Sequence, residues 1–455
     1  MKMKRKTLAV LQAVMMLAAC GLAAAEQEAR KIETPADAEE WIRVFLGEHP
    51  EELDGAWAMT AQMQAAADQM GGIGGLAKSL AALGTAGEIG SAVEGELSGF
   101  KTFSIPCAFS LMPVDLVLVI QDGAVAGLQT GAYSGGKEEK TESDLFDSVE
   151  LNLPVPALGE LPGILTMPKG DGPFPAVILI QGSGASDKDE AVMGLRPFRD
   201  IAEGLAEQGV AVYRFDKRTY VYGAAMADNR RITLMDESID DAVNAVQLLA
   251  KQEKIDPERI FVLGHSLGGN AIPAIARELK KQPADSRGFI MMAASPRPLE
   301  ELAREQNEFL YSLMPEETEE QKAEKEAYLA EIEKTFSDLD KLKDLDSLTD
   351  DDTVLGIWKS YWKWLADYDI LQAAKEITQP VLLLQGEEDY QMTMEDFSIW
   401  QEALGDKANW KMVAYPGLVH VFIPGQKAEG SAVYSRTEKV DSRVISDIAD
   451  FINAQ

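Results

Sequence analysis

The chain has 455 residues, of which 46% are hydrophobic, and it carries a formal net charge of −32 at pH 7. This length exceeds the core of one ordinary domain, and the apolar content is ample for globular folding. The excess of Asp and Glu excludes nucleic acid as a partner and excludes recruitment by anionic lipid headgroups. Because strongly anionic ligands would also be repelled at low salt, we expect a neutral small molecule as the ligand.

Residues 1–25 have the pattern of an export signal peptide. Lys or Arg at positions 2, 4, 5 and 6 precedes an apolar segment, 8–19, that is too short to span a bilayer, and small residues follow. Removal of these four cations takes the formal net charge from −32 to about −36. We therefore expect an exported protein and exclude this segment from the predicted fold.

Within this segment, residues 17–20 (LAAC) resemble the lipobox of bacterial lipoproteins, in which the cysteine becomes the lipidated N-terminus. Lipidation of Cys20 would hold the protein on an extracytoplasmic membrane face, since each buried methylene contributes ~0.8 kcal/mol, and we expect no other membrane attachment. The alternative is cleavage after residues 23–25 (AAA), which would give a freely secreted protein. In the lipidated form Cys107 has no disulfide partner, and we interpret it as a small buried apolar residue.

Residues 34–131 are predicted to form a separate, small α+β domain. Thr34 and Pro35 are typical of a helix start, and glycines at 71–75 interrupt the helical pattern that follows. Three strand patterns come next, at 100–109, at 114–120 after which 121–123 forms a turn, and in a last strand through Gly131.

This domain has no recognisable catalytic set, since its single histidine, His49, precedes Pro50 where a helix ends. Two roles stay open for it, namely partner binding or substrate presentation, and a stabilising spacer. Residues 132–147 are polar, lack apolar periodicity and are predicted to form a linker.

Residues 148–455 are predicted to form an α/β domain with a mostly parallel sheet and right-handed crossovers. Apolar runs typical of strands alternate with helical patterns, at 148–153, 163–167, 176–181, 210–215, 259–264, 287–293, 380–385 and 410–414. The interval between the strand patterns at 287–293 and 380–385 breaks this spacing, because 296–376 is far too long for one crossover. We expect a helical cap domain there.

Within this cap, Trp358, Tyr361 and Trp362 recur at three- and four-residue spacing and predict one apolar helical face. Such a face is either packed core or the wall of a substrate pocket, and we keep these three residues as pocket candidates. The charged run 316–333 is interpreted as the solvated surface of a helix.

Residues 264–268 (GHSLG) form a G-x-S-x-G motif between a strand pattern and a small-residue helix pattern. In that context the chain makes a sharp turn that only small neighbours tolerate, and the turn lifts the serine hydroxyl clear of the sheet edge. The motif therefore predicts Ser266 as a nucleophile.

A serine needs a positioned base, normally a histidine that a carboxylate orients. His265 is adjacent to the nucleophile and His49 lies in the other domain, which leaves His420, in a Pro/Gly loop after a strand pattern. For the orienting acid we select Asp389, which follows the strand pattern 380–385 and faces the carboxyl end of the sheet. Its nearby rivals are Glu387, Glu388 and Asp396.

An oxyanion hole requires two backbone N–H groups, one of which follows the nucleophile and is here Leu267. The second is expected from residues 181–184 (QGSG), which end an earlier strand pattern, and we select the N–H of Ser183. The alternative is that these glycines only form a turn.

Two charged groups near this loop are also noted. Residues 187–190 (DKDE) form either a surface turn or a contact to substrate or a cation, but no further ligand set accompanies them, so no metal is expected. Residues 216–218 (DKR) follow a strand at the same sheet edge and are interpreted as a support for the active-site loops; a substrate-carboxylate contact by Arg218 is the alternative.

With these motifs in order, residues from about 148 onward resemble the α/β-hydrolase superfamily, and within it the dienelactone-hydrolase-like and acyl-peptidase-like bacterial serine esterases. Some members of that group carry a similar small α+β domain before the hydrolase. The resemblance implies hydrolysis of a small ester or acyl compound through a Ser-His-Asp triad and an acyl-enzyme, without a cofactor. The alternatives are a peptidase or acyl thioesterase on the same triad, and a non-catalytic surface lipoprotein that binds a ligand.

Overall fold

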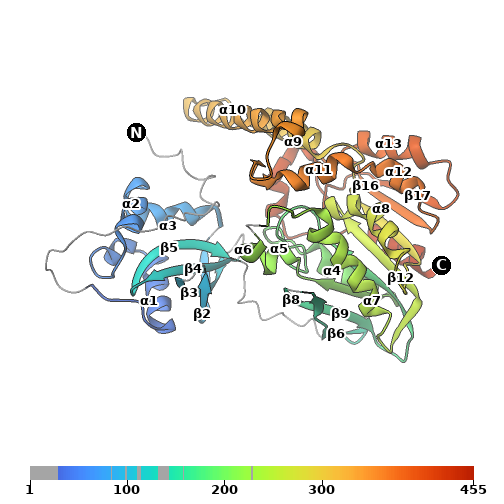
Figure 1. Ribbon diagram of the computed structural model, residues 1–455, viewed down its shortest axis with the longest axis horizontal. Coiled ribbons are helices and arrows are strands. Elements are labelled where there is room, and N and C mark those ends of the chain that lie inside the picture. The colour runs from blue at the N-terminus through green and yellow to red at the C-terminus, as the bar shows by residue number, and fades with distance from the viewer. Residues whose placement is uncertain are drawn as a thin grey trace. The chain divides into compact units, whose positions relative to one another are not determined.

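The computed structural model describes residues 29–83, 85–97, 100–109, 114–131, 143–156, 158–226 and 229–455 (Figure 1). Two compact units divide the chain, Met1–Glu139 and Lys140–Gln455. The expected signal peptide with Cys20, and positions 132–142 of the expected linker, lie outside the described residues. Within the described ranges, no helix has both the length and the apolar character needed to cross a bilayer.

The first unit packs short helices against an antiparallel sheet. Helix α1 (Pro35–Phe45) begins where the sequence predicts it, because Thr34 and Asp37 form a capping box. The sheet has the order β1-β3-β4-β5, with β2 paired to β3. Its elements are η1 (Pro50–Leu53), α2 (Ala61–Gln69), α3 (Ile73–Ser79), η2 (Leu80–Leu83), β1 (Ala86–Ile89), β2 (Val93–Leu97), β3 (Phe100–Phe109), β4 (Val114–Gln121) and β5 (Ala124–Gly131).

The core of this unit contains large aromatic residues and the expected cysteine. Trp41 and Phe45 stack at a ring-centroid distance of 5.0 Å. Cys107 is fully buried, and burial raises the pKa of its thiol to about 12, so it is an unreactive apolar side chain. The sequence did not predict β1 and β2, because both are short and rich in Gly and Glu and lack an alternating apolar pattern.

The second unit is built on a sheet of eight strands in its described residues, in the order β17-β16-β13-β12-β10-β11-β9-β6. Neighbours are parallel from β17 to β11, whereas β9 is antiparallel to both β11 and β6. A small hairpin of β7 and β8 follows β6. The strands are β6 (Phe146–Glu150), β7 (Leu153–Val155), β8 (Gly159–Leu161), β9 (Gly163–Pro168), β10 (Phe174–Ile180), β11 (Ala211–Phe215), β12 (Ile255–His265), β13 (Gly288–Met292), β16 (Val381–Gly386) and β17 (Trp410–Tyr415).

Helices cover both faces of this sheet, since its central strands are buried on both sides (Figure 1). Alternate residues of β10 illustrate the division: Ile178 packs in the cluster that includes α7, α8 and α13, and Val177 packs in the cluster with α4 and α14. The covering helices are α4 (Pro197–Ala206), α7 (Asp240–Leu249), α8 (Leu267–Leu279), α13 (Met394–Leu404) and α14 (Ser442–Asn453). Shorter segments connect them, namely α5 (Arg218–Val221), α6 (Gly223–Met226), the π-helical turn η3 (Met235–Ile239) and η5 (Lys427–Ser435).

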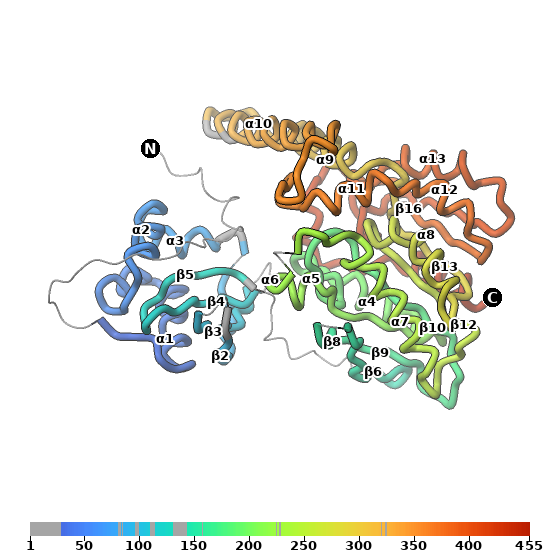
Figure 2. Tube along the Cα trace, in the orientation of Figure 1, coloured from blue at the N-terminus to red at the C-terminus, as the bar shows by residue number. Residues whose placement is uncertain are grey.

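The long interval between β13 and β16 forms a mainly helical insertion, drawn in orange in Figure 2. Leu339, Val354 and Trp362 form its own small core. Helix α10 is largely solvent-exposed, as its charged sequence predicts. The insertion consists of α9 (Leu299–Leu313), α10 (Glu319–Asp340), η4 (Lys341–Ser347), β14 (Thr353–Val354), β15 (Ile357–Trp358), α11 (Lys359–Asp367) and α12 (Ile370–Lys375).

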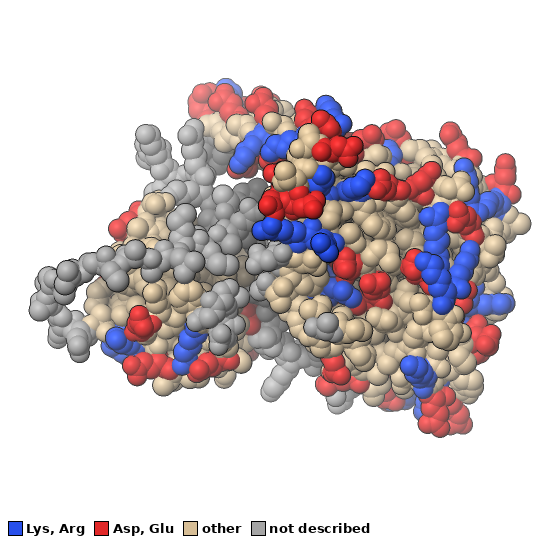
Figure 3. Space-filling model, viewed as in Figure 1, with Lys and Arg blue, Asp and Glu red and all other residues tan. Residues whose placement is uncertain are grey.

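Charged side chains of both signs lie on the face of the second unit that Figure 3 shows. Acidic residues are interspersed with Lys and Arg over its visible surface (Figure 3). Many of these charges are paired, including Arg277 with Glu376 and Arg304 with Asp340.

Candidate active site

The G-x-S-x-G motif forms a strained elbow at the end of β12. Ser266 has φ 53° and ψ −121°, a conformation that L-residues rarely adopt, and its N–H donates to Met292 O at 2.8 Å. Small neighbours are obligatory, because a Cβ on Gly264 would lie 2.1 Å from Gly268 O, and one on Gly268 would lie 2.2 Å from Ile180 O. The strand, the turn and helix α8 thus present Ser266 at the carboxyl edge of the sheet.

The loops after β16 and β17 bring Asp389 and His420 together. Nδ1 of His420 lies 2.7 Å from Oδ2 of Asp389, and both side chains are buried. The other carboxylate oxygen, Oδ1, accepts from the N–H groups of Gln391 and Met392 at 2.7 and 3.0 Å. With Nδ1–H donating to this fixed carboxylate, Nε2 of His420 is left as the proton acceptor.

Two of the three rival carboxylates, those of Asp396 and Glu388, are engaged elsewhere. Asp396 forms a bidentate ion pair with Arg297, at 2.8 and 2.9 Å, and caps α13. Glu388 accepts from the N–H of Lys427 at 3.1 Å. Of the described carboxylates that follow β16, only Asp389 forms a hydrogen bond with a histidine. Among the described residues, no hydrogen bond joins the Ser266 hydroxyl to His420. Catalytic hydrogen bonds are often long before substrate binds and shorten in the complex.

The loop 181–184 lies directly against the nucleophile, since a Cβ on Gly182 would be 3.1 Å from Cβ of Ser266. The N–H of Gly182 is occupied, because it donates to Glu190 Oε1 at 2.6 Å. Leu267 is the first residue of α8, where an N–H has no acceptor within the helix. The arrangement therefore leaves the N–H groups of Ser183 and Leu267 as the two donor candidates.

His265 and Glu190 support the loops of His420 and Gly182. The sequence did not predict this role for either residue. Nε2 of His265 lies 3.0 Å from the carbonyl oxygen of His420. Its Nδ1 lies 2.9 Å from Oε2 of Glu190, a contact that becomes an ion pair when the imidazole is protonated. Burial has the largest single effect and lowers the pKa of His265, but the contacts with Glu190 and the His420 carbonyl and the charge of Asp389 together outweigh it, and the pKa is raised.

Of residues 216–218, Lys217 contacts the loop 181–184. Nζ of Lys217 donates to Gly182 O at 2.8 Å and forms an ion pair with Glu237. Arg218 forms a bidentate pair with Asp241, at 2.7 and 2.5 Å. The guanidinium of Arg218 is therefore paired within the fold, which disfavours its alternative contact with a substrate carboxylate.

The turn 187–190 is more buried than a surface turn. Oδ1 of Asp187 accepts from the N–H groups of Asp189 and Ala191, and Asp189 pairs with Arg214 at 2.7 Å. Burial, aided by the charge of Asp189, raises the pKa of Asp187 to about 6. Across the described ranges no group of three or more potential ligands is arranged to hold a metal ion.

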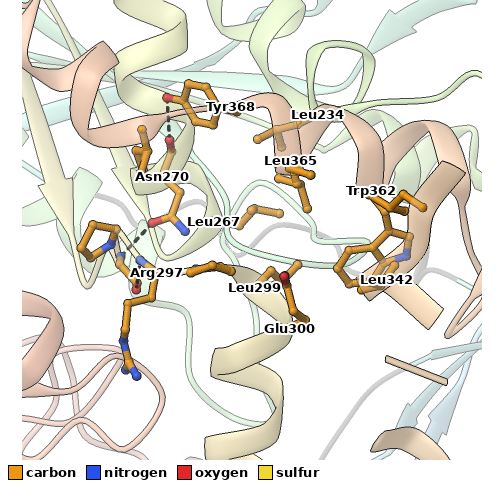
Figure 4. A pocket seen from close by; sticks show the side chains of 16 residues that line it. Leu234, Leu267, Asn270, Arg297, Leu299, Glu300, Leu342, Trp362, Leu365 and Tyr368 are labelled. Carbon is orange, nitrogen blue, oxygen red and sulfur yellow. Dashed lines mark hydrogen bonds between the residues drawn. The ribbon is translucent and has the colours of Figure 1, made fainter. Parts of the chain in front are cut away.

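A cavity of about 320 Å³ adjoins Leu267 and is covered by the insertion. Figure 4 shows leucine side chains around its centre and the Arg297 guanidinium pointing away from them. The wall is mostly apolar and comes from α8, α9, η4, α11 and α12. Its residues are Leu234, Leu267, Asn270, Ser295, Pro296, Arg297, Pro298, Leu299, Glu300, Leu342, Leu345, Trp362, Leu365, Ala366, Tyr368 and Ile370.

Of the three aromatic pocket candidates, Trp362 lines this cavity, whereas Trp358 and Tyr361 do not. The helical periodicity assumed for them includes Trp358, but this residue belongs to strand β15 and precedes α11. Tyr361 lies on a different side of α11, where its hydroxyl donates to Glu237 at 2.6 Å. The structure thus places only one of the three on the cavity wall.

A mostly parallel α/β sheet with a serine elbow at its carboxyl edge, and a paired Asp and His on the next loops, defines the α/β-hydrolase class of serine hydrolases. The chain belongs to this superfamily: the family model described as serine aminopeptidase, S33, matches residues 195–424. The esterase EstD of Thermotoga maritima is 37% identical over 334 residues, which cover 73% of this chain and 75% of that protein. The protein is therefore an enzyme of a hydrolase family that includes an esterase.

Solved structures with a similar fold include Est1E from Butyrivibrio proteoclasticus, with a TM-score of 0.42 and 17% identity over 67% of this chain and 99% of that one. A puromycin-hydrolysing peptidase of Mycobacterium tuberculosis has a TM-score of 0.44 and 16% identity over 78% of this chain and 45% of that one. At these scores the structural likeness adds nothing to the family assignment, which rests on the sequence.

Proposed function

We propose that this serine hydrolase cleaves small carboxylic esters through an acyl-enzyme on Ser266. The observation that carries the proposal is the 2.7 Å contact between His420 Nδ1 and Asp389, on loops adjacent to the elbow that presents Ser266. The 37% identity to an esterase over most of the chain supports an ester as the substrate. No cofactor is required for this chemistry.

In the first half-reaction, Oγ of Ser266 attacks the ester carbonyl carbon while Nε2 of His420 takes the hydroxyl proton. The tetrahedral intermediate collapses, the C–O bond to the alcohol breaks, and Nε2 returns the proton to the leaving alkoxide. In the second half-reaction, Nε2 of His420 takes a proton from a water that attacks the acyl-enzyme. The acyl C–Oγ bond then breaks, Nε2 returns the proton to Oγ of Ser266, and the carboxylic acid leaves. Asp389 holds the imidazole orientation and stabilises the imidazolium throughout.

The N–H groups of Leu267 and Ser183 are proposed to bind the oxyanion. Both belong to segments that flank Ser266, and Gly182 N–H is excluded because it donates to Glu190. Donors of this kind stabilise charge that develops in the transition state, and loss of one typically costs ~10²- to 10³-fold in rate.

The cavity beside Leu267 is proposed to receive one apolar group of the substrate. Its volume of about 320 Å³ and its leucine-rich wall favour a neutral acyl or alcohol group of small to moderate size. Charged acyl groups are disfavoured, since the one guanidinium on the wall, that of Arg297, is already paired with Asp396 and Glu305.

The test is hydrolysis of p-nitrophenyl esters of increasing acyl length by the signal-free protein, together with Ser266→Ala and His420→Ala. We expect turnover that both substitutions abolish and a serine-reactive fluorophosphonate that labels Ser266. Labelling without turnover of any ester would instead favour a peptide or thioester substrate. Absence of both labelling and turnover would favour the non-catalytic, ligand-binding alternative.

We also propose that the enzyme is exported and anchored through a lipidated Cys20. The support is the basic start, the short apolar segment and the LAAC sequence at 17–20. The mass of the mature protein from its native host tests this. A mass that fits diacylated or triacylated Cys20 is expected, and an N-terminus after residues 23–25 would establish free secretion instead.

A further inference from the structure

We infer that Lys217 is a positioning residue, which holds the Gly182–Ser183 peptide of the oxyanion hole in place. Glu237 and Tyr361 extend this support to the cap, the helical insertion between β13 and β16. The inference rests on the proposed function, because it concerns the same oxyanion hole. It assigns a role to three buried polar side chains that take no direct part in the triad.

The key contact is made to one peptide group. Nζ of Lys217 donates to Gly182 O at 2.8 Å, and the side chain of Lys217 is only 2% exposed. The carbonyl of Gly182 and the N–H of Ser183 belong to the same planar peptide, in which they point in opposite directions. A lysine that fixes the carbonyl therefore also fixes the direction of the Ser183 N–H.

The preceding peptide is fixed independently. The N–H of Gly182 donates to Glu190, and Nε2 of Gln181 donates to Phe215 O at 2.5 Å. The next group along the loop is the Gly182–Ser183 peptide, which these contacts do not orient. Lys217 supplies a contact to its carbonyl oxygen.

The charge of Lys217 also acts on the donor. An ammonium at a carbonyl oxygen polarises the peptide and strengthens its N–H as a hydrogen-bond donor, an effect that is larger in a buried site. An oxyanion hole gains most from donors that are already oriented before charge develops. Lys217 therefore provides both orientation and polarisation without touching the substrate.

Glu237 connects this lysine to the cap. It forms an ion pair with Lys217, and its Oε2 accepts from the hydroxyl of Tyr361 on α11 at 2.6 Å. Lys217, Glu237 and Tyr361 are all buried. A buried ion pair is no more stabilising than apolar packing of the same volume, so fold stability alone does not account for it.

The neighbouring pair Arg218–Asp241 is a matched control. It is also a buried ion pair, here bidentate, between the segment after β11 and the segment that contains η3 and α7, but it makes no contact with the loop 181–184 among the described residues. Glu237→Gln and Asp241→Asn each remove one buried charge. They differ in whether the affected cation contacts the oxyanion loop.

The experiment compares Lys217→Met/Glu237→Gln, Lys217→Arg, Glu237→Gln, Tyr361→Phe and Asp241→Asn for kcat, KM and Tm. For the Lys217→Met/Glu237→Gln variant we expect kcat to fall about 10²-fold with KM within about twofold, because the lost support acts on the transition state. Lys217→Arg should recover part of this loss. Tyr361→Phe removes the hydroxyl that donates to Glu237 but keeps the Lys217–Glu237 ion pair, and it should lower kcat about threefold. This variant tests the contacts from Lys217 to Tyr361 if the double variant does not fold. Asp241→Asn should lower Tm and leave kcat within about twofold.

A second readout separates positioning from general damage. A trifluoromethyl ketone forms a tetrahedral adduct whose oxygen occupies the oxyanion hole, whereas the matched methyl ketone binds as a ground-state analogue. In the double variant the Ki of the fluorinated ketone should rise in parallel with the loss in kcat/KM, and that of the methyl ketone should not change.

Equal losses of kcat in Glu237→Gln and Asp241→Asn, or an unchanged Ki for the fluorinated ketone in the double variant, would overturn the inference. If Tyr361→Phe has the kcat of the wild type, the part of the inference that extends the support of Lys217 to the cap is overturned. A wild-type protein that hydrolyses no ester and binds neither ketone would overturn the proposed function itself, before any variant is compared.

Discussion

His265 contacts the main chain of His420, with Nε2 3.0 Å from the carbonyl oxygen and ring centroids 4.7 Å apart. Because a carbonyl only accepts hydrogen bonds, Nε2 of His265 carries the proton. The residue beside the nucleophile thereby supports the loop that carries the candidate base. Glu190 accepts from the N–H of Gly182 and contacts His265, so three active-site loops meet at the side chains of His265 and Glu190.

His265→Leu is expected to lower kcat about tenfold, because the loop of His420 loses its support, and to lower Tm, because Glu190 is left buried without its cation. His265→Gln is the control, since its side-chain amide can still donate to the carbonyl of His420 and should retain most of the turnover. Steady-state kinetics and thermal unfolding of both variants measure this. A kcat equal to that of the wild type in His265→Leu contradicts the supporting role.

Asp389→Asn is expected to lower kcat by about 10³- to 10⁴-fold with little effect on Tm. The asparagine keeps an oxygen for the N–H groups of Gln391 and Met392, but its amide no longer accepts the Nδ1–H of His420, so the imidazole tautomer is wrong. The measurement is burst and steady-state turnover of a p-nitrophenyl ester.

The matched variant for this test is Asp396→Asn. It should lower Tm, because Arg297 and the N-terminal capping box of α13 lose their carboxylate. The change in kcat should be far smaller than in Asp389→Asn. The reverse order of the two kcat values would assign the orienting acid to Asp396.

Asp187 is expected to make the free energy of unfolding fall as the pH rises from about 4 to about 6. The folded protein holds this proton up to about pH 6, whereas the unfolded chain loses it near 3.8, the ordinary pKa of an aspartate, so the stabilisation is present below pH 4 and is lost through pH 6. The two-unit difference corresponds to up to about 3 kcal/mol.

Denaturant unfolding of the wild type and Asp187→Asn at pH 4, 5, 6 and 7 tests this prediction. The asparagine does not titrate, and its oxygen can still accept from Asp189 and Ala191. The stability of the variant relative to the wild type should therefore increase between pH 4 and 6 and stay constant above pH 7. A relative stability that does not change with pH would show that Asp187 titrates normally.

Much of the second unit was predictable because its signals are local. Strands β10, β11, β13 and β16 coincide with predicted apolar runs, and the elbow at 264–268 is a contiguous motif whose glycines have no alternative. Strand β6 (FDSVE) lacks such a run and begins two residues before the predicted strand 148–153. His420 and Asp389 were identified by elimination and by their position after strands. The structure places their side chains 2.7 Å apart.

Among the supporting residues, the sequence indicated residues 216–218 by their position after a strand. It did not indicate the contacts of His265, Glu237 and Tyr361, because these contacts join segments far apart in the sequence. Tyr361 lies 124 positions from Glu237, and the ring of His265 reaches the backbone of a residue 155 positions away. The available signal was a charged residue at a buried position, as in Lys217 directly after a strand. Periodicity failed for Trp358 because it does not identify the residue at which a helix begins.

Ala366→Phe is expected to shift acyl-chain selectivity toward shorter esters. Ala366 lies on the cavity wall yet is exposed, so a larger side chain there can fill part of the 320 Å³ without disturbing the core. The value of kcat/KM should fall about 10-fold or more for the longest ester that the wild type accepts and change little for the acetate, since each excluded methylene removes up to ~0.8 kcal/mol of burial. Lys363→Phe, an exposed position of α11 off the cavity wall, is the control and should leave the profile unchanged. Equal losses for acetate and the longest ester in Ala366→Phe would place the acyl group elsewhere and leave this cavity to the alcohol.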